Sequence, residues 1–325
     1  MKYRCSLIGL ALACWAAPGI RADVTIRYES ELKPSPAVQA LAGGQIAKTA
    51  CASCQPVTIR MRGNHAYTTV RNWVQLFDFA KQEVTLIDPV HKTYATLPIS
   101  QLPGRMADAL PQPEAKQQTA ASQLMAAFKI STNSKMTGAT DVIQGVQAEE
   151  REITMTMDLP SPAGAAQTVP GLKMVLDIWT AKREETLRNP AIRELTGFYA
   201  WQNYVLNPTA MVERFAAKMP GLASAMRPML DEIAKNQSVV LRMHMEIHMP
   251  FLATLGQSQP AVDPSAPFLE MNEEVKELST TPLDDALFEV PKDFNAAPVD
   301  DMVRAMFQAQ SPGAPAPAAL DATTH

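Results

Sequence analysis

Residues Val239–Met249 read VVLRMHMEIHM, with apolar and polar residues alternating along the stretch. Successive side chains of a β-strand point to opposite faces, so this alternation predicts a strand with one apolar and one polar face. The apolar face is rich in methionine, and the polar face carries His244, Glu246 and His248. Two interpretations follow: a sheet that holds a hydrophobic ligand, or a metal site.

The same period-two alternation predicts further strands. Gly63-Asn64 is a hairpin-turn signal, and consecutive hairpins form an antiparallel meander. We therefore expect a mainly β (α+β) fold, built on a large curled antiparallel sheet of roughly nine to eleven strands with helices packed on one face. The other expected strands are Val24–Glu29, Val57–Arg62, His65–Val70, Trp73–Asp78, Glu83–Asp88, Thr93–Leu97, Ile153–Leu159 and Leu172–Trp179.

Helical signals are fewer than strand signals. Asn189 followed by Pro190 is a typical N-cap and first helical position, and we expect a helical insert at about residues 190–236 with breaks at Pro220 and Pro228. The predicted helices are Pro36–Lys48, Gln101–Leu110, Pro190–Tyr204 and Pro208–Asn236.

The N-terminus has the features of a signal peptide over residues 1–22, with a basic start, a short apolar run and cleavage after Ala22. We expect a periplasmic or secreted protein of a Gram-negative-type bacterium. A lipoprotein anchored at Cys14 is the alternative. Residues 23–307 form the expected single domain, and the Pro- and Ala-rich tail 308–325 is predicted to be disordered.

The composition limits the classes of function. The formal net charge is −4, and the segment expected to be removed is basic, so the mature chain is more acidic still. Acidity without a basic cluster argues against nucleic acid as a partner. The chain has no Gly-x-Ser-x-Gly, phosphate-binding glycine loop or His-Glu-x-x-His pattern. We therefore expect no enzyme activity and no cofactor.

Three segments resemble periplasmic proteins of the outer-membrane lipoprotein carrier (LolA-like) fold. They are the start Val24–Glu29, the hairpin Val84–Tyr94 with its Asp88 and Lys92-Thr-Tyr94, and the end Glu277–Pro291, which is similar to the closing strand of that fold. The resemblance implies a half-open barrel with helices plugging its concave side. It also implies an acyl chain or other hydrophobic ligand on that side. The long helical insert departs from the family, so neither transport activity nor any functional residue is carried over.

The candidate ligand-binding residues are mostly methionines, which are flexible and polarizable and can line an adaptable apolar surface. Ordinary core packing between sheet and helices is the favoured interpretation of the methionines taken alone, a ligand groove is the second, and a soft-metal site through thioethers is the weakest. The groove candidates are Met155, Met157, Met174, Leu241, Met243, Met245, Met249, Met226 and Met229.

His244, Glu246 and His248 are metal-ligand types on one strand face, yet steps of roughly 6.5–7 Å along a strand separate them. A polar outer face with cross-strand pairs is the favoured interpretation, so no metal is expected. Cys51 and Cys54 lack a surrounding βαβ pattern, which favours a local disulfide over a redox site.

The sequence thus supports a non-enzymatic protein that binds a hydrophobic small molecule or a lipidated protein in the concave face of the sheet. Peripheral association with a membrane is compatible with this role. An envelope protein–protein interaction module with a filled core is the alternative hypothesis, and metal binding through His244, Glu246 and His248 is the third.

Overall fold

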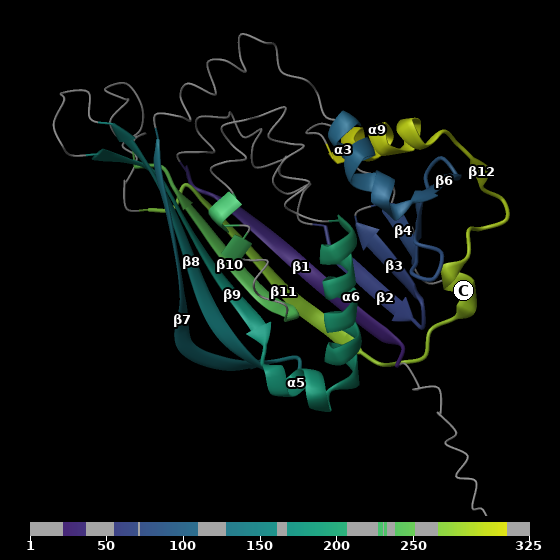
Figure 1. The fold of residues 1–325 in the computed structure, drawn as a ribbon, viewed down its shortest axis with the longest axis horizontal. Coiled ribbons are helices and arrows are strands. Elements are labelled where there is room, and N and C mark those ends of the chain that lie inside the picture. The colour runs from purple at the N-terminus through teal and green to yellow at the C-terminus, as the bar shows by residue number, and fades with distance from the viewer. Residues whose placement is uncertain are drawn as a thin grey trace, which may run out of the picture.

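The computed structural model describes residues 22–36, 55–70, 72–109, 128–160, 168–206, 227–229, 231–232, 238–250 and 266–310. These residues form one twelve-stranded sheet in the order β12-β6-β5-β4-β3-β2-β1-β11-β10-β9-β8-β7. Figure 1 shows the sheet strongly twisted and open, with β7 to β10 on one side of the view and β2 to β6 on the other. The mainly β class and the large curled sheet are thus confirmed, but the described strands do not close into a barrel.

The strands are β1 (Val24–Pro34), β2 (Val57–Arg62), β3 (His65–Val70), β4 (Trp73–Asp78), β5 (Glu83–Asp88), β6 (Thr93–Pro98), β7 (Lys129–Ile143), β8 (Val146–Pro160), β9 (Thr168–Ala181), β10 (Val240–His248), β11 (Leu269–Ser279) and β12 (Asn295–Ala296). All neighbours pair antiparallel except β12, which pairs parallel with β6 through two residues. The expectation of a purely antiparallel sheet is therefore wrong at this edge. The segment that follows the 3₁₀ helix η3 (Asp285–Phe288) runs beside β6 in the same direction, so its two residues Asn295 and Ala296 pair with β6 in parallel.

The meander from β2 to β6 matches the prediction closely. Its tight turns place Gly63, Gln82 and Lys92 at positive φ, which lets the strands reverse within two to four residues. In the last turn the buried Asp88 accepts hydrogen bonds from the backbone N–H of Val90 at 2.9 Å and of His91 at 3.2 Å. The Asp88 side chain thereby stabilises the turn between β5 and β6.

The second half of the sheet is longer than predicted. The strands β8 and β9 extend well beyond the expected Ile153–Leu159 and Leu172–Trp179. The edge strand β7 was not predicted at all, because its sequence KISTNSKMTGATDVI is largely polar and mostly exposed. An edge strand has one free side and little burial, so it lacks the apolar alternation that reveals central strands.

The C-terminal region departs from the expected closing strand over Glu277–Pro291. The strand β11 ends at Ser279, and the chain then runs through the short 3₁₀ helix η3 (Asp285–Phe288) to β12. Asp284 caps η3 by accepting a hydrogen bond from the backbone N–H of Ala286 at 3.0 Å. Val290 and Phe294 pack beside this path against the outward side of β4 to β6.

Helices cover one face of the sheet. They are the 3₁₀ turn η1 (Ile99–Gln101), α3 (Leu102–Ala109), α5 (Arg183–Arg188), α6 (Pro190–Leu206) and α9 (Val299–Gln310). Asn189 caps α6 as predicted, accepting from the backbone N–H of Ala191 at 3.0 Å. Figure 1 shows α6 crossing the middle of the sheet and α3 beside α9 over the end that contains β6. The helix α9 was not predicted.

Strand register defines two faces of the sheet. The inner face contains Val24, Ile26 and Tyr28 of β1 and is the face that the helices cover. The outer face contains the alternate residues, among them His244 and Glu246 of β10. The inner face has two clusters of different character, which we call the aromatic half and the methionine half.

The aromatic half comprises the inner face of β1 to β6, the adjoining ends of β7 to β11 and α6, where the rings of Phe77, Phe79, Phe198, Tyr199 and Trp201 contact one another. The methionine half comprises the rest of the inner face of β7 to β11 with the adjoining end of β1. Six of the thirteen apolar side chains in its cluster are methionines: Met155, Met157, Met174, Met229, Met243 and Met245.

Candidate ligand-binding site

The methionine half brings together six of the predicted groove residues. Met155 and Met157 are 3% and 7% exposed, and Met174, Met243 and Met245 are half-buried beside them. Register explains the grouping, because Met155 lies opposite Met174 in β8 and β9, and the neighbouring β10 presents its methionines to the same face. The structure thus confirms that alternation placed these side chains on one apolar face.

Met229 is the member of this cluster that comes from the predicted helical insert. It lies in the helical residues 227–229, is 6% exposed and packs against the sheet cluster. This contact places residues 227–229 against the inner face of the methionine half. Met226 lies outside the described residues.

Two other predicted groove residues lie elsewhere. Leu241 is fully buried and packs in the cluster of the aromatic half. Met249 follows the end of β10 and is half-buried. The structure therefore does not bring Leu241 together with the methionines.

Sequence reasoning missed part of the same surface. Leu32 of β1 and Leu269 and Met271 of β11 are half-buried on the inner face, beside Met245 and Ile247 of β10. Leu32 lies opposite Met271, which lies opposite Met245, so these side chains form one continuous row across three strands. The apolar residues at positions 269 and 271 of β11 were the available signal.

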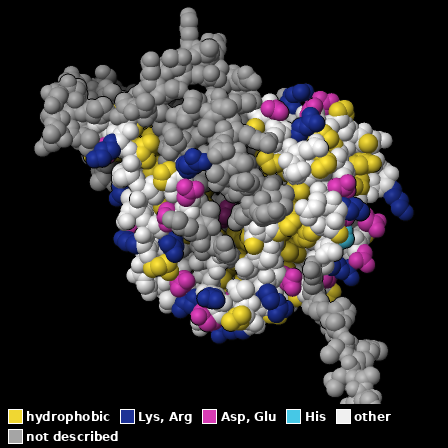
Figure 2. Space-filling model, in the orientation of Figure 1, with side chains coloured by type: hydrophobic (Ala, Val, Ile, Leu, Met, Phe, Trp, Pro, Cys, Tyr) yellow, Lys and Arg dark blue, Asp and Glu magenta, His cyan; other side chains and the backbone are white. Residues whose placement is uncertain are grey.

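Figure 2 shows patches of hydrophobic side chains on the face that the helices cover, with charged side chains between them and around the margins. The row of Leu32, Met271 and Met245 is followed, towards the aromatic half, by a row that carries charged side chains. In that next row Ser30 lies opposite Glu273, followed across the sheet by Met243, Ile178 and Arg151. We call this row the charged row.

The charged row holds one acidic and one basic side chain on the inner face. The Ser30 hydroxyl donates to the Glu273 carboxylate at 2.9 Å. At the other end the Arg151 guanidinium donates to the Ser134 hydroxyl at 3.2 Å. Within the described residues neither Glu273 nor Arg151 forms an ion pair.

A tyrosine pair lies where the two halves of the inner face meet. The Tyr199 hydroxyl donates to the Tyr28 hydroxyl at 2.9 Å, and the Tyr28 hydroxyl donates to the backbone carbonyl of Val240 at 3.0 Å. Burial raises the pKa of Tyr199 to about 12, and burial followed by the proximity of Tyr199 raises the pKa of Tyr28 as well. Both hydroxyls therefore stay neutral and link α6 to β1 and β10.

The outer face of β10 is a polar ladder, as predicted. His244 contacts Asn272 through Nδ1 at 2.7 Å and Glu246 through Nε2 at 3.2 Å, while His248 Nε2 lies 2.9 Å from the other Glu246 oxygen. Partial burial lowers the pKa of His244, but the hydrogen bonds to Asn272 and Glu246 outweigh it and raise that pKa above its ordinary value. Hydrogen bonds from His248 hold the pKa of Glu246 below its ordinary value.

His244, Glu246 and His248 of this ladder are the residues of the predicted alternative metal site. Within the described ranges no group of three His, Cys, Asp or Glu side chains is arranged to hold a metal ion. The two imidazoles instead share one carboxylate between them. Cys51 and Cys54 lie outside the described residues, so the predicted disulfide stays a prediction.

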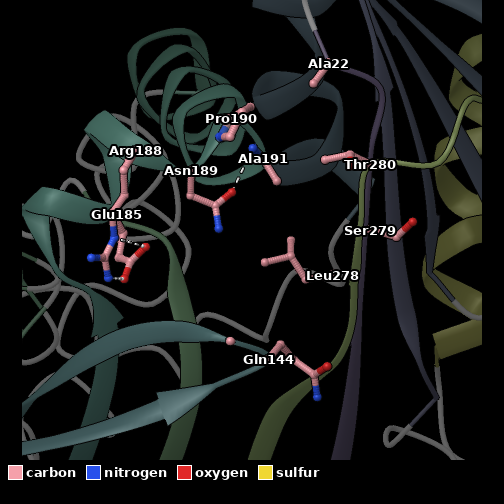
Figure 3. Close-up of a pocket in the computed structure, with 11 residues that line it drawn as sticks. Ala22, Gln144, Glu185, Arg188, Asn189, Pro190, Ala191, Leu278, Ser279 and Thr280 are labelled. Carbon is pink, nitrogen blue, oxygen red and sulfur yellow. Dashed lines mark hydrogen bonds and ion pairs between the residues drawn. The ribbon is translucent and has the colours of Figure 1, made fainter.

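A cleft of about 610 Å³ opens where α5, α6, the β7–β8 turn and the end of β11 meet. Figure 3 shows Arg188 beside Glu185 on one side of this cleft and the Leu278 side chain extending into it from the other. Glu185 is 2% exposed and accepts hydrogen bonds from Arg188 and, at 2.9 Å, from the backbone N–H of Gln147. The Arg188 hydrogen bond holds the pKa of Glu185 below its ordinary value, so its carboxylate joins α5 to β8.

No known protein-family model matches the chain, and no curated protein matches it significantly. Among the described residues, no helix is both long and apolar enough to cross a membrane.

Proposed function

We propose that the protein binds a hydrophobic ligand, the acyl chain of a lipid or of a lipidated protein, on the methionine half of the inner face. Binding rather than catalysis is the proposed role, in the periplasmic or secreted compartment that the N-terminal signal predicts. The driving force is removal of apolar surface from water, worth roughly 25 cal/mol per Å².

One observation carries the proposal. Six apolar side chains in adjacent register on β1, β10 and β11 are only half-buried, although they continue a surface that includes the buried Ile153, Leu176 and Ile178. A filled core would cover them as fully as it covers Val24 and Ile26 in the aromatic half. The six side chains are Leu32, Met243, Met245, Ile247, Leu269 and Met271.

The chemistry of the surface fits an aliphatic chain. Methionine has three rotatable bonds and no branch at Cβ, so a methionine-rich surface can follow ligands of different shape. Met229, in the described residues 227–229, packs against the same cluster and covers part of it.

The direct test is native mass spectrometry of protein purified from a bacterial host, followed by titration with a fluorescent fatty acid. We expect a co-purified lipid and saturable binding of the probe. Met245→Gln places a polar amide on the apolar surface and should weaken probe binding about ten-fold, equivalent to ~1.4 kcal/mol.

The matched control is Val175→Gln, which puts the same amide on the outer face of β9 opposite Glu246. This variant should bind the probe like the wild type. Ligand-free protein that excludes the fluorescent fatty acid would instead favour the alternative of an interaction module with a filled core.

A further inference from the structure

The charged row adds a head-group requirement to the proposed hydrophobic site, and this inference rests on that proposed function. The apolar row of Leu32, Met271 and Met245 lies one inner-face step, about 7 Å, from the row that carries Glu273. A chain lying on the apolar rows therefore brings its polar end to the charged row.

Two opposite charges occupy this one row. Glu273 of β11 and Arg151 of β8 are separated by Met243 and Ile178, which corresponds to three strand spacings or about 14 Å between backbones. The long Arg151 side chain spans part of that distance. A serine hydroxyl contacts each charge, Ser30 at Glu273 and Ser134 at Arg151, and both hydroxyls lie on the inner face.

On the outer face of the same strands, charged side chains form ion pairs. Arg242 of β10 contacts Asp141 at 2.8 Å and Glu274 at 3.4 Å, and Lys135 of β7 contacts Glu152 at 3.0 Å. Within the described residues Glu273 and Arg151 have hydroxyl contacts but no counter-charge. Half-buried charges without a counter-charge are costly, and a ligand that supplies both signs would stabilise them most.

We propose that the charged row binds the head of a zwitterionic amphiphile, a phospholipid with an ammonium and a phosphate group, while its acyl chains lie on the methionine half. Glu273 accepts hydrogen bonds from the ammonium group. Arg151 donates to the phosphate oxygens, a pairing that guanidinium geometry favours. Met243 and Ile178 lie between them beneath the glycerol portion.

The test is competition against a bound fluorescent fatty acid with three short-chain soluble lipids that share their acyl chains: a phosphatidylethanolamine, a phosphatidylglycerol and a diacylglycerol. We expect the phosphatidylethanolamine to displace the probe at about ten-fold lower concentration than the phosphatidylglycerol. The diacylglycerol, which has no charged head, should be the weakest competitor.

Two variants separate the roles of the two charges. Glu273→Gln should remove the preference for phosphatidylethanolamine over phosphatidylglycerol, and Arg151→Gln should reduce both phospholipids towards the diacylglycerol. The matched controls are Glu270→Gln on β11 and Lys173→Gln on β9, whose side chains lie on the outer face. Both should retain the wild-type ranking.

The outcomes distinguish this inference from the proposed function. Equal competition by all three lipids, a reversed ranking, or a ranking unchanged by Glu273→Gln and Arg151→Gln overturns the head-group site while the hydrophobic site stands. Failure of the wild type to bind any acyl probe overturns both.

Discussion

The two halves of the inner face share one sheet and yet pack in different ways. In the aromatic half, rings meet at defined distances and angles, such as Phe77 and Phe198 at 6.2 Å and 72°. In the methionine half, flexible side chains fill the surface, and several of them stay half-buried. Aromatic rings have few rotamers and a preferred geometry, whereas methionine adapts. The difference is the one that the proposed ligand site requires, with rigid packing in one half and adaptable side chains in the other.

The largest expected effect is in the aromatic half. Phe198 of α6 is 3% exposed and contacts Phe77, Phe79 and Trp201. Phe198→Ala should lower the free energy of unfolding by about 3–5 kcal/mol, because it leaves a cavity among rings that cannot close it. Urea denaturation measures this change. The exposed Arg193→Ala on the same helix should stay within about 0.5 kcal/mol of the wild type, and a similarly small loss in Phe198→Ala would contradict a rigid aromatic half.

The second effect concerns the junction between α5 and β8, which Glu185 forms. Glu185→Ala removes its hydrogen bonds with Arg188 and with the backbone N–H of Gln147. The expected loss is about 1.5–3 kcal/mol, the range for hydrogen bonds to a charged group. The neighbouring exposed Glu184→Ala is the control for denaturation. Equal stability of both variants would show that the junction does not depend on this carboxylate.

Sequence reasoning predicted one part of the molecule well and another poorly, for physical reasons. The meander β2 to β6 was found because each strand alternates and tight turns such as Gly63-Asn64 separate the strands. The edge strand β7 was missed because its residues have little to bury. Leu241 was assigned to the groove because alternation gives the face of a residue and not the cluster in which it packs, and Leu241 packs in the aromatic half.

The candidate site shows the same limit. The methionines of β8 to β10 were predicted from alternation within each strand, which is local information. The charged row depends on register among β1, β11, β10, β9 and β8, so it joins Ser30 to Glu273 across more than two hundred residues of sequence. No local pattern carries that pairing.

A smaller effect is expected for a conservative change in the methionine half. Met155→Leu keeps the apolar volume and should alter the free energy of unfolding by less than about 1.5 kcal/mol, because flexible neighbours can repack around it. Denaturation of this variant beside Met136→Leu, which changes a methionine that is 45% exposed on β7, gives the comparison. A loss as large as that of Phe198→Ala would mean that the two halves are equally rigid.

The smallest effect lies on the outer face behind the methionine half. The raised pKa of His244 means that its protonated form is favoured in the folded state, so its contribution is present below the ordinary value of 6.5 and is lost as pH rises through the raised pKa. The lowered pKa of Glu246 gives a contribution that is present above its ordinary value of 4.5 and is lost as pH falls through the lowered pKa. The pair therefore stabilises the fold most between these two values.

His244→Gln tests this window. The wild type should exceed the variant in free energy of unfolding by less than about 1 kcal/mol near pH 5.5, because both partners are about one-third exposed and solvent screens them. The difference should shrink as pH rises above 7. Lys173→Gln, on the neighbouring strand β9, is the control and should differ from the wild type by a constant amount between pH 5 and 8. If the difference between the wild type and His244→Gln does not vary with pH, the ladder of the outer face is held by hydrogen bonds alone. The charge of His244 then contributes nothing to the free energy of unfolding.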